Sequence, residues 1–252
     1  MPDDLGIMVE KFDSTNVDAN RFNHNNKIYK VGRKFTFTYY YEDKNGVRQL
    51  MTKGALNQQN NYDWKFERQD KKDNNSVVKI ILSVNAGLSP FIEQMPDYNQ
   101  TVVTYDFKLL NGESWNNEMT GVIENEKNVW MHPPRTDFFK ILELNPFPYI
   151  KAPFIVGNKW DWQLKFGKHW ADKRWLVWEG ENENIYHYEI TRKLLLPTTL
   201  GKITCFEVKS TAKSNLGQTK LIAYFNVEYG FVKFDYTNID GTKTVIEIEK
   251  VE

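Results

Sequence analysis

The sequence predicts an all-β, predominantly antiparallel protein, built on one large curved meander sheet that forms an incomplete barrel or a sandwich, with one short helix near residues 136–145. Three observations support this prediction. Apolar and polar residues alternate with a period of two through most of the chain. Short turn signals, such as DKNG at Asp43–Gly46, separate the alternating segments. β-branched and aromatic residues fill these segments, as a pleated and half-buried surface favours.

The first half of the chain alternates clearly between apolar and polar residues. Because side chains two positions apart point to the same face of a strand, each alternating segment is expected to bury one face. The expected strands are Phe35–Tyr41, its hairpin partner Val47–Lys53, Tyr62–Phe66, Val78–Val84, Val103–Leu109 and a segment near Met119–Glu124.

The second half repeats the pattern and ends in a meander. The run Arg174–Lys193 is long enough for one bent strand or two. Leu221–Val227 is apolar on both faces, so we expect it to be covered twice, by the helix or by a second sheet layer. The other expected strands are Trp160–Phe166, Ile203–Ser210, Lys220–Val227, Phe231–Thr237 and Thr244–Val251.

The segment Thr136–Asn145 breaks the period of two and predicts a short helix. Its apolar residues recur at near-helical spacing, and Thr136 or Asp137 is placed to cap its start. Prolines bracket the segment, and residues 145–154 are expected to form an extended connector because residues before proline avoid the helical region. We therefore expect residues 1–252 to form a single β domain, or two sheet-building halves (about 30–131 and 154–252) joined by the helix and the proline-rich connector 132–153.

Composition limits the class of protein. The 252 residues include 33 basic and 33 acidic side chains, so the formal net charge is zero and the overall charge expected of a nucleic-acid binder or an anionic-membrane binder is missing. Apolar runs fall short of the roughly 20 residues of a transmembrane helix. Cys205 is the one cysteine, which rules out an intrachain disulfide and predicts a partly buried, inert thiol.

The last quarter of the chain resembles a known group of proteins. Pro197, Gly201, Cys205–Phe206, Tyr224–Phe225 and Gly230–Lys233 follow a pattern, over roughly Leu196–Glu252, that is similar to uncharacterised bacterial cell-envelope proteins related in architecture to the periplasmic lipoprotein carriers. The resemblance implies a curved antiparallel sheet that wraps apolar material. It also implies a periplasmic or cell-envelope location, with the signal segment missing from this sequence, because the start lacks the features of a signal peptide. A cytoplasmic location is the alternative.

Tryptophan is concentrated in one part of the chain: five of the eight tryptophans lie between Trp160 and Trp178. Trp160 shares a strand face with Leu164 and Phe166, which predicts a place in the core. Trp170 falls in an expected turn close to Arg174, where an exposed ring would stack on a sugar or a planar ligand, or would cover the core. Strand parity places Trp175 and Trp178 on opposite faces.

A second candidate is the tract VWMHPPRTD, in which two prolines hold His132 and Arg135 on a stiff loop before the helix. The arginine fork suits a carboxylate or phosphate, although a local ion pair with Asp137 is the alternative. We expect a pocket beside the rings of this region. The candidate ligand-binding residues are Trp130, His132, Arg135, Phe138, Trp160, Trp170, Arg174, Trp175 and Trp178.

Signals of catalysis or metal binding are weak. The four histidines do not occur at metal-ligand spacing, and His187 and Glu189 share one strand face but are too few for a zinc site. We therefore predict no catalytic residue, no metal and no cofactor.

Four functions remain open at this point. The first is a non-enzymatic cell-envelope protein that binds an apolar or lipid-like ligand in a groove of the curved sheet. The alternatives are a carbohydrate-binding module that uses exposed tryptophans, and a hydrolase of unknown substrate. The fourth is a surface for self-association or for another envelope protein. A nucleic-acid partner is not expected.

Overall fold

The computed structural model describes residues 26–56, 62–86 and 100–252, and these residues form the predicted all-β, antiparallel fold. Fourteen strands within the described residues belong to one sheet. Short 3-10 helices lie at η3 (Gln69–Lys71), η4 (Asp137–Leu144) and η5 (Lys168–Trp170). The strands are β1 (Lys34–Glu42), β2 (Arg48–Leu56), β3 (Tyr62–Arg68), β4 (Val77–Val84), β5 (Thr101–Leu109), β6 (Ser114–Glu124), β7 (Asn128–Met131), β8 (Tyr149–Lys151), β9 (Lys159–Gly167), β10 (Glu181–Thr198), β11 (Gly201–Ser214), β12 (Gly217–Asn226), β13 (Gly230–Thr237) and β14 (Lys243–Val251).

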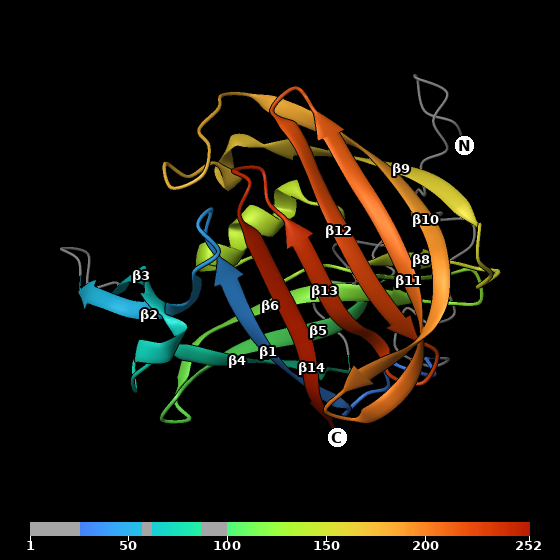
Figure 1. Cartoon of the computed structure of the whole chain (residues 1–252), viewed down its shortest axis with the longest axis horizontal. Coiled ribbons are helices and arrows are strands. Elements are labelled where there is room, and N and C mark those ends of the chain that lie inside the picture. The colour runs from blue at the N-terminus through green and yellow to red at the C-terminus, as the bar shows by residue number, and fades with distance from the viewer. Residues whose placement is uncertain (1–25, 57–61, 87–99) are drawn as a thin grey trace.

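The sheet curls until its two edges approach each other (Figure 1). Its strand order is β8-β7-β6-β5-β4-β1-β14-β13-β12-β11-β10-β9, and the β2–β3 hairpin branches from the end of β1. The first and second halves of the chain meet where β1 pairs with β14. β8 and β9 follow each other in the chain yet stand at opposite ends of the order, and the ring of Tyr149 on β8 lies 5.5 Å from that of Trp160 on β9. Aromatic side chains therefore fill the seam between the two edges.

The inner face of the curved sheet and the helix η4 form the core. Figure 1 shows η4, in yellow-green, lying in the mouth of the curled sheet. Phe138 and Phe139 of η4 are fully buried, and their rings contact Phe66 at 4.8 Å and Tyr39 at 5.0 Å respectively. The predicted helix is confirmed, with 3-10 geometry over eight residues. Prolines on both sides leave room for a short helix only, and the 3-10 form is used for short pieces.

The start of η4 differs from the prediction, because neither Thr136 nor Asp137 caps it with a side-chain hydrogen bond. Instead the Asp137 carboxylate accepts a 2.9 Å hydrogen bond from the indole N–H of Trp115 on β6. Asp137 also has a φ of +50°, in the left-handed region that few residues other than glycine, asparagine and aspartate adopt. Its side chain therefore fastens the helix to the sheet while its backbone turns the chain.

We expect Asp137→Ala to lower the free energy of unfolding by about 2 kcal/mol, since it removes the acceptor for Trp115 and places alanine in the left-handed region. Asp137→Asn keeps an acceptor and tolerates this backbone, so it should lose about half as much or less. Urea denaturation followed by circular dichroism measures both variants. Equal stability of the alanine variant and the wild type would contradict this role.

Three parts of the sheet differ from the sequence prediction. β7 was not predicted, and β8 lies inside the tract expected to be an extended connector. The run predicted to be strand from Arg174 begins its strand only at Glu181, because residues 171–180 form a loop with a single bridge between Asp172 and Leu176. Gly180, with a φ of +75°, provides the turn into β10. Among the described residues, no helix has the length and apolar character needed to cross a membrane.

Candidate functional site

The predicted residues Trp130 and His132 lie in the interior, where aromatic rings pack against one another. The ring centroid of His132 lies 4.9 Å from that of Trp130 and 5.0 Å from that of Phe147. The ring centroids of Trp130 and Trp162 are 5.9 Å apart. Trp160 is buried as predicted and stacks on Tyr188, with 5.3 Å between ring centroids. Most of these rings therefore bury their faces against each other.

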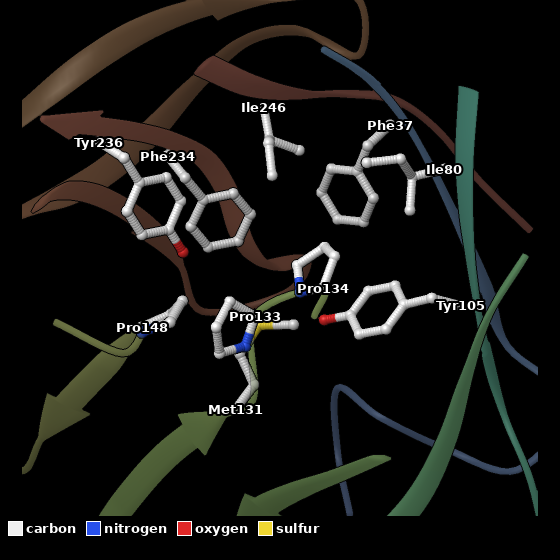
Figure 2. Close-up of a pocket in the computed structure, with 10 residues that line it drawn as sticks. All are labelled: Phe37, Ile80, Tyr105, Met131, Pro133, Pro134, Pro148, Phe234, Tyr236 and Ile246. Carbon is white, nitrogen blue, oxygen red and sulfur yellow. The ribbon is translucent and has the colours of Figure 1, made fainter. Parts of the chain in front are cut away.

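A small cavity lies beside Pro133 and Pro134 (Figure 2). Its volume is about 10 Å³, which is room for about one water molecule. Trp130, Phe138 and Trp160, which were expected to border a pocket, do not line it. A lipid-sized ligand does not fit this cavity. The lining residues are Phe37, Ile80, Tyr105, Met131, Pro133, Pro134, Pro148, Phe234, Tyr236 and Ile246.

Two ionisable side chains meet close to these prolines. Nδ1 of His132 lies 3.6 Å from Oε1 of Glu143 on η4, whose side chain is only 3 % exposed. The separation is longer than a hydrogen bond, and both of these buried atoms lack a hydrogen-bond partner among the described residues. The pair is packed among aromatic rings and no substrate-sized cavity adjoins it in the described structure. Its surroundings therefore indicate a contact within the core of the protein.

Arg135 forms hydrogen bonds within the protein. Its backbone N–H donates a 2.9 Å hydrogen bond to Oε1 of Glu118, and its guanidinium donates to the carbonyl oxygen of Met119 at 3.4 Å. Burial raises the pKa of Glu118 to about 7, and the neighbouring carboxylates of Glu143 and Asp137 add to the effect. Arg135 therefore lies beside an acid that titrates near neutrality.

The predicted residues of the 168–178 region form a separate group. Trp178 is buried against Leu144 and Phe166, and the half-buried Trp170 and Trp175 pack around the same cluster. The indole N–H of Trp175 donates a 3.2 Å hydrogen bond to the carbonyl oxygen of Trp170. A buried ring cannot stack on a sugar, so Trp178 does not provide the expected face.

Arg174 has a structural role in this group. Its guanidinium carbon lies 3.9 Å from the ring centroid of Trp64, and its Nη2 lies 2.8 Å from Oδ1 of Asp63. Both partners belong to β3, so Arg174 ties the 171–180 loop to the β2–β3 hairpin. The structure thus separates the predicted site residues into an interior group and this loop group.

The largest hollow described lies elsewhere, on the outer face of strands β9 to β12. This groove has a volume of about 660 Å³. Nine of its lining residues are exposed or half-buried, and the buried Trp160, Tyr188, Ser210 and Leu221 alternate with them along the same strands. A bulge in β10 between Ile190 and Arg192 accompanies the bend of these strands. The lining residues are Lys159, Trp160, Asp161, His187, Tyr188, Glu189, Thr191, Lys209, Ser210, Thr211, Lys220, Leu221 and Ile222.

The β9–β10 half of the groove consists of ionisable side chains that pair across the two strands. Nδ1 of His187 lies 2.5 Å from Oδ1 of Asp161, which is its cross-strand neighbour. Nζ of Lys159 lies 3.4 Å from the carboxylate of its cross-strand neighbour Glu189. Exposed pairs of this kind contribute little to stability, so their charges remain available to a ligand.

The β11–β12 half carries excess positive charge. Lys220 is exposed and has no carboxylate within 4 Å among the described residues. Lys209 is 3.8 Å from Glu207, but that carboxylate is bound more closely by Arg192 at 2.5 Å and by Thr191 at 2.8 Å. Burial alone would raise the pKa of Glu207, yet these hydrogen bonds hold it below its ordinary value. Arg192 and Lys209 therefore share the single carboxylate of Glu207, and Lys209 is the more distant of the two.

One apolar side chain lies between the two lysines. Ile222 on β12 is the cross-strand neighbour of Lys209 and is half-buried. It belongs to the strand that was expected to be covered on both faces. Its outer face is not covered by η4, which lies on the inner side of the sheet, and Ile222 lines the groove instead.

Comparison with known proteins gives remote structural likeness. No family model matches the chain, and no curated protein matches it. A chain from Bacteroides fragilis described as a "putative exported protein with YmcC-like fold" is 12% identical, with a TM-score of 0.49, and the match covers 88% of this chain and 96% of that one. A "putative lipoprotein" from Parabacteroides distasonis is also 12% identical, with a TM-score of 0.47 and coverage of 89% and 97%. Both similarities are too remote to transfer a function.

Of the predicted site residues, only Trp160 lines the groove. The shared face of His187 and Glu189 was visible in the sequence and does mark part of it. The double apolar pattern around Ile222 was a second signal. Lys209 and Lys220 carried no signal, because exposed lysines are common on strands and their meeting depends on which strands become neighbours.

Proposed function

We propose that this protein is a non-enzymatic binding protein of the bacterial cell envelope that holds a lipid-like ligand with an anionic group in the groove over β9 to β12. The observation that carries the proposal is the 660 Å³ groove, where Lys220 has no carboxylate partner among the described residues and Lys209 shares Glu207 with Arg192, against about 10 Å³ in the cavity beside Pro133 and Pro134. The resemblance over Leu196–Glu252 supports the location in the envelope.

The groove offers each part of such a ligand a partner. Lys209 and Lys220 would bind the anionic group, with the hydroxyl of Thr211 between them on the strand pair. Ile222 would contact the apolar part nearest to the head group. The paired charges on β9 and β10 would accept or donate hydrogen bonds without leaving an unpaired charge behind, because each has a partner already.

We expect Lys209→Glu combined with Lys220→Glu to weaken binding of lysophosphatidylglycerol by at least about tenfold, since each removes an attraction of about 1 kcal/mol and adds a repulsion. Calorimetric titration below the micelle concentration measures this, with lysophosphatidylcholine as the ligand without net charge. Lys65→Glu is the control for added negative charge, at an exposed lysine on β3 outside the groove, and it makes half the change in net charge.

Two results would remove the proposal. One is equal affinity of the wild type for both lysophospholipids. The other is equal loss of affinity in the Lys65→Glu control and in the groove variant, because this would indicate a general charge effect. Native mass spectrometry of protein purified from bacterial envelope extract would then show whether any ligand accompanies it.

A further inference from the structure

Four loops gather at one end of the curved sheet, and we call them the loop rim: residues 27–33, 125–128, 152–158 and 226–230. They precede β1, connect β6 to β7, connect β8 to β9 and connect β12 to β13. This end of the sheet is opposite the end that carries the β2–β3 hairpin (Figure 1).

Direct contacts join the four loops into one surface. The Glu124 carboxylate, next to the 125–128 turn, accepts hydrogen bonds from the backbone of residues 27–29. The N–H of Ala152 donates to the carbonyl oxygen of Lys127 at 2.7 Å. Arg33 donates to the carbonyl oxygen of Glu228 at 3.0 Å, and the Phe154 ring lies 5.2 Å from Phe225 at the end of β12. The loops therefore hold fixed positions relative to one another.

The rim exposes aliphatic side chains at its loop tips. Val31 is 52%, Ile155 58%, Val156 55% and Val227 61% exposed. A single exposed aliphatic residue needs no explanation, but these four come from three loops that contact one another. Such a group of apolar tips on adjoining loops is typical of an interaction surface.

Three lysines belong to the rim loops, and a fourth, Lys151, directly precedes one of them. Lys27, Lys30 and Lys127 are exposed and Lys151 is half-buried, and none of the four forms an ion pair within 4 Å in the described part of the chain. The rim loops contain two exposed acids, Glu126 and Glu228. The rim is therefore positively charged although the whole chain has a net charge of zero. Whole-chain composition argued against an anionic-membrane binder because it averages over this local excess.

We propose that the loop rim docks on the surface of an anionic lipid bilayer. Ile155, Val156 and Val227 would enter the head-group region, where aliphatic side chains gain from leaving water. The lysines would lie at the level of the phosphates, each attracted by the negative surface potential. The groove begins at Lys159, three residues after Val156, so docking would bring the groove next to the bilayer.

Flotation with lipid vesicles tests this inference. The full chain should float with vesicles of one part phosphatidylglycerol to three parts phosphatidylcholine, and far less with pure phosphatidylcholine. Ile155→Ser combined with Val156→Ser should reduce the partition coefficient by about tenfold. Lys27→Gln, Lys30→Gln and Lys127→Gln together should reduce it by at least about tenfold, and so should about 0.5 M NaCl.

Val177→Ser is the matched control. Val177 is 64% exposed in the 171–180 loop, beyond the end of β9 that lies away from the rim. It should float like the wild type. The substituted side chains are exposed or half-exposed, so unchanged thermal unfolding would show that every variant still folds.

Several outcomes would overturn the inference. One such outcome is that the wild type does not float with anionic vesicles. Another is that the Ile155/Val156 variant floats to the same extent as the Val177 control. A concentration-dependent dimer that this variant loses, without flotation of the wild type, would identify the rim as a contact between copies. Loss of flotation in the Lys209/Lys220 groove variant alone would assign lipid contact to the groove, which supports the proposed function and removes the rim. Unchanged flotation of that groove variant is the expected result.

Discussion

Replacing Glu124 by alanine is expected to lower the free energy of unfolding by about 3–5 kcal/mol. The Glu124 side chain is buried, and its two oxygens accept hydrogen bonds of 2.7–2.9 Å from the backbone N–H groups of Lys27, Ile28 and Tyr29. Alanine would leave several N–H groups without an acceptor in a place that excludes water, at a cost of about 1–3 kcal/mol each before relaxation.

The structure around Glu124 makes the effect specific. Glu124 is the last residue of β6. Its hydrogen bonds therefore hold the segment that leads into β1 against the end of β6. Tyr29 depends on that position, because its hydroxyl group accepts a hydrogen bond from the N–H of Phe231 at 3.4 Å. Loss of Glu124 should therefore also loosen the contact between residues 26–33 and β13.

Urea denaturation measures the Glu124→Ala effect, and Glu126→Ala is the control. Glu126 is two residues away and exposed, so its loss should change stability by less than about 0.5 kcal/mol. Glu124→Gln keeps one carbonyl oxygen as an acceptor but brings an NH₂ group toward other donors, so an intermediate loss is expected. Similar stability of the Glu124→Ala and Glu126→Ala variants would contradict this account.

The period of two was a reliable guide where a strand buries one face. Trp160, Trp162 and Phe166 point into the core as their parity predicted, and all three are buried. The same rule failed at Trp175 and Trp178, because residues 171–180 are not a strand. Alternation along the chain predicts which side chains share a face only where the segment forms a hydrogen-bonded strand.

Short strands were missed for a related reason. β7 and β8 have four and three residues, too few for an alternation to show. Every residue of β7 is buried, so its sequence reads as a run of apolar residues with one asparagine. Their pairing becomes visible only when the neighbouring strand and the helix are in place.

The groove and the loop rim could not be predicted because each joins residues far apart in the chain. Lys209 and Lys220 are diagonal neighbours because β11 and β12 form a hairpin, but Lys159 joins the same groove only through the pairing of β9 with β10 and of β10 with β11. The four rim loops come together through contacts such as that between Arg33 and Glu228. The amino-acid composition does not reveal the local positive charge or the exposed apolar side chains of the rim, because it is an average over 252 residues.

Glu118 should make the protein less stable as pH rises through the range from about 4.5 to about 7. Burial, reinforced by Glu143 and Asp137, raises the pKa of Glu118 from 4.5 to about 7 in the folded state. Between these values the folded protein binds more protons than the unfolded chain, so the free energy of unfolding falls with increasing pH. Above about pH 7 the penalty is complete, on the order of 2–3 kcal/mol.

The variant Glu118→Gln isolates this contribution, because glutamine keeps the carbonyl oxygen that accepts the N–H of Arg135 but does not ionise. Urea unfolding at several pH values between about 4.5 and 8 should show the wild type losing stability relative to the variant, with the variant more stable at the upper end. Glu113→Gln, in the exposed turn before β6, should follow the wild type at every pH. Parallel curves for wild type and Glu118→Gln would mean that Glu118 is ionised at no cost in the folded protein. In that case the N–H of Arg135 and its guanidinium would stabilise the carboxylate enough to offset its burial.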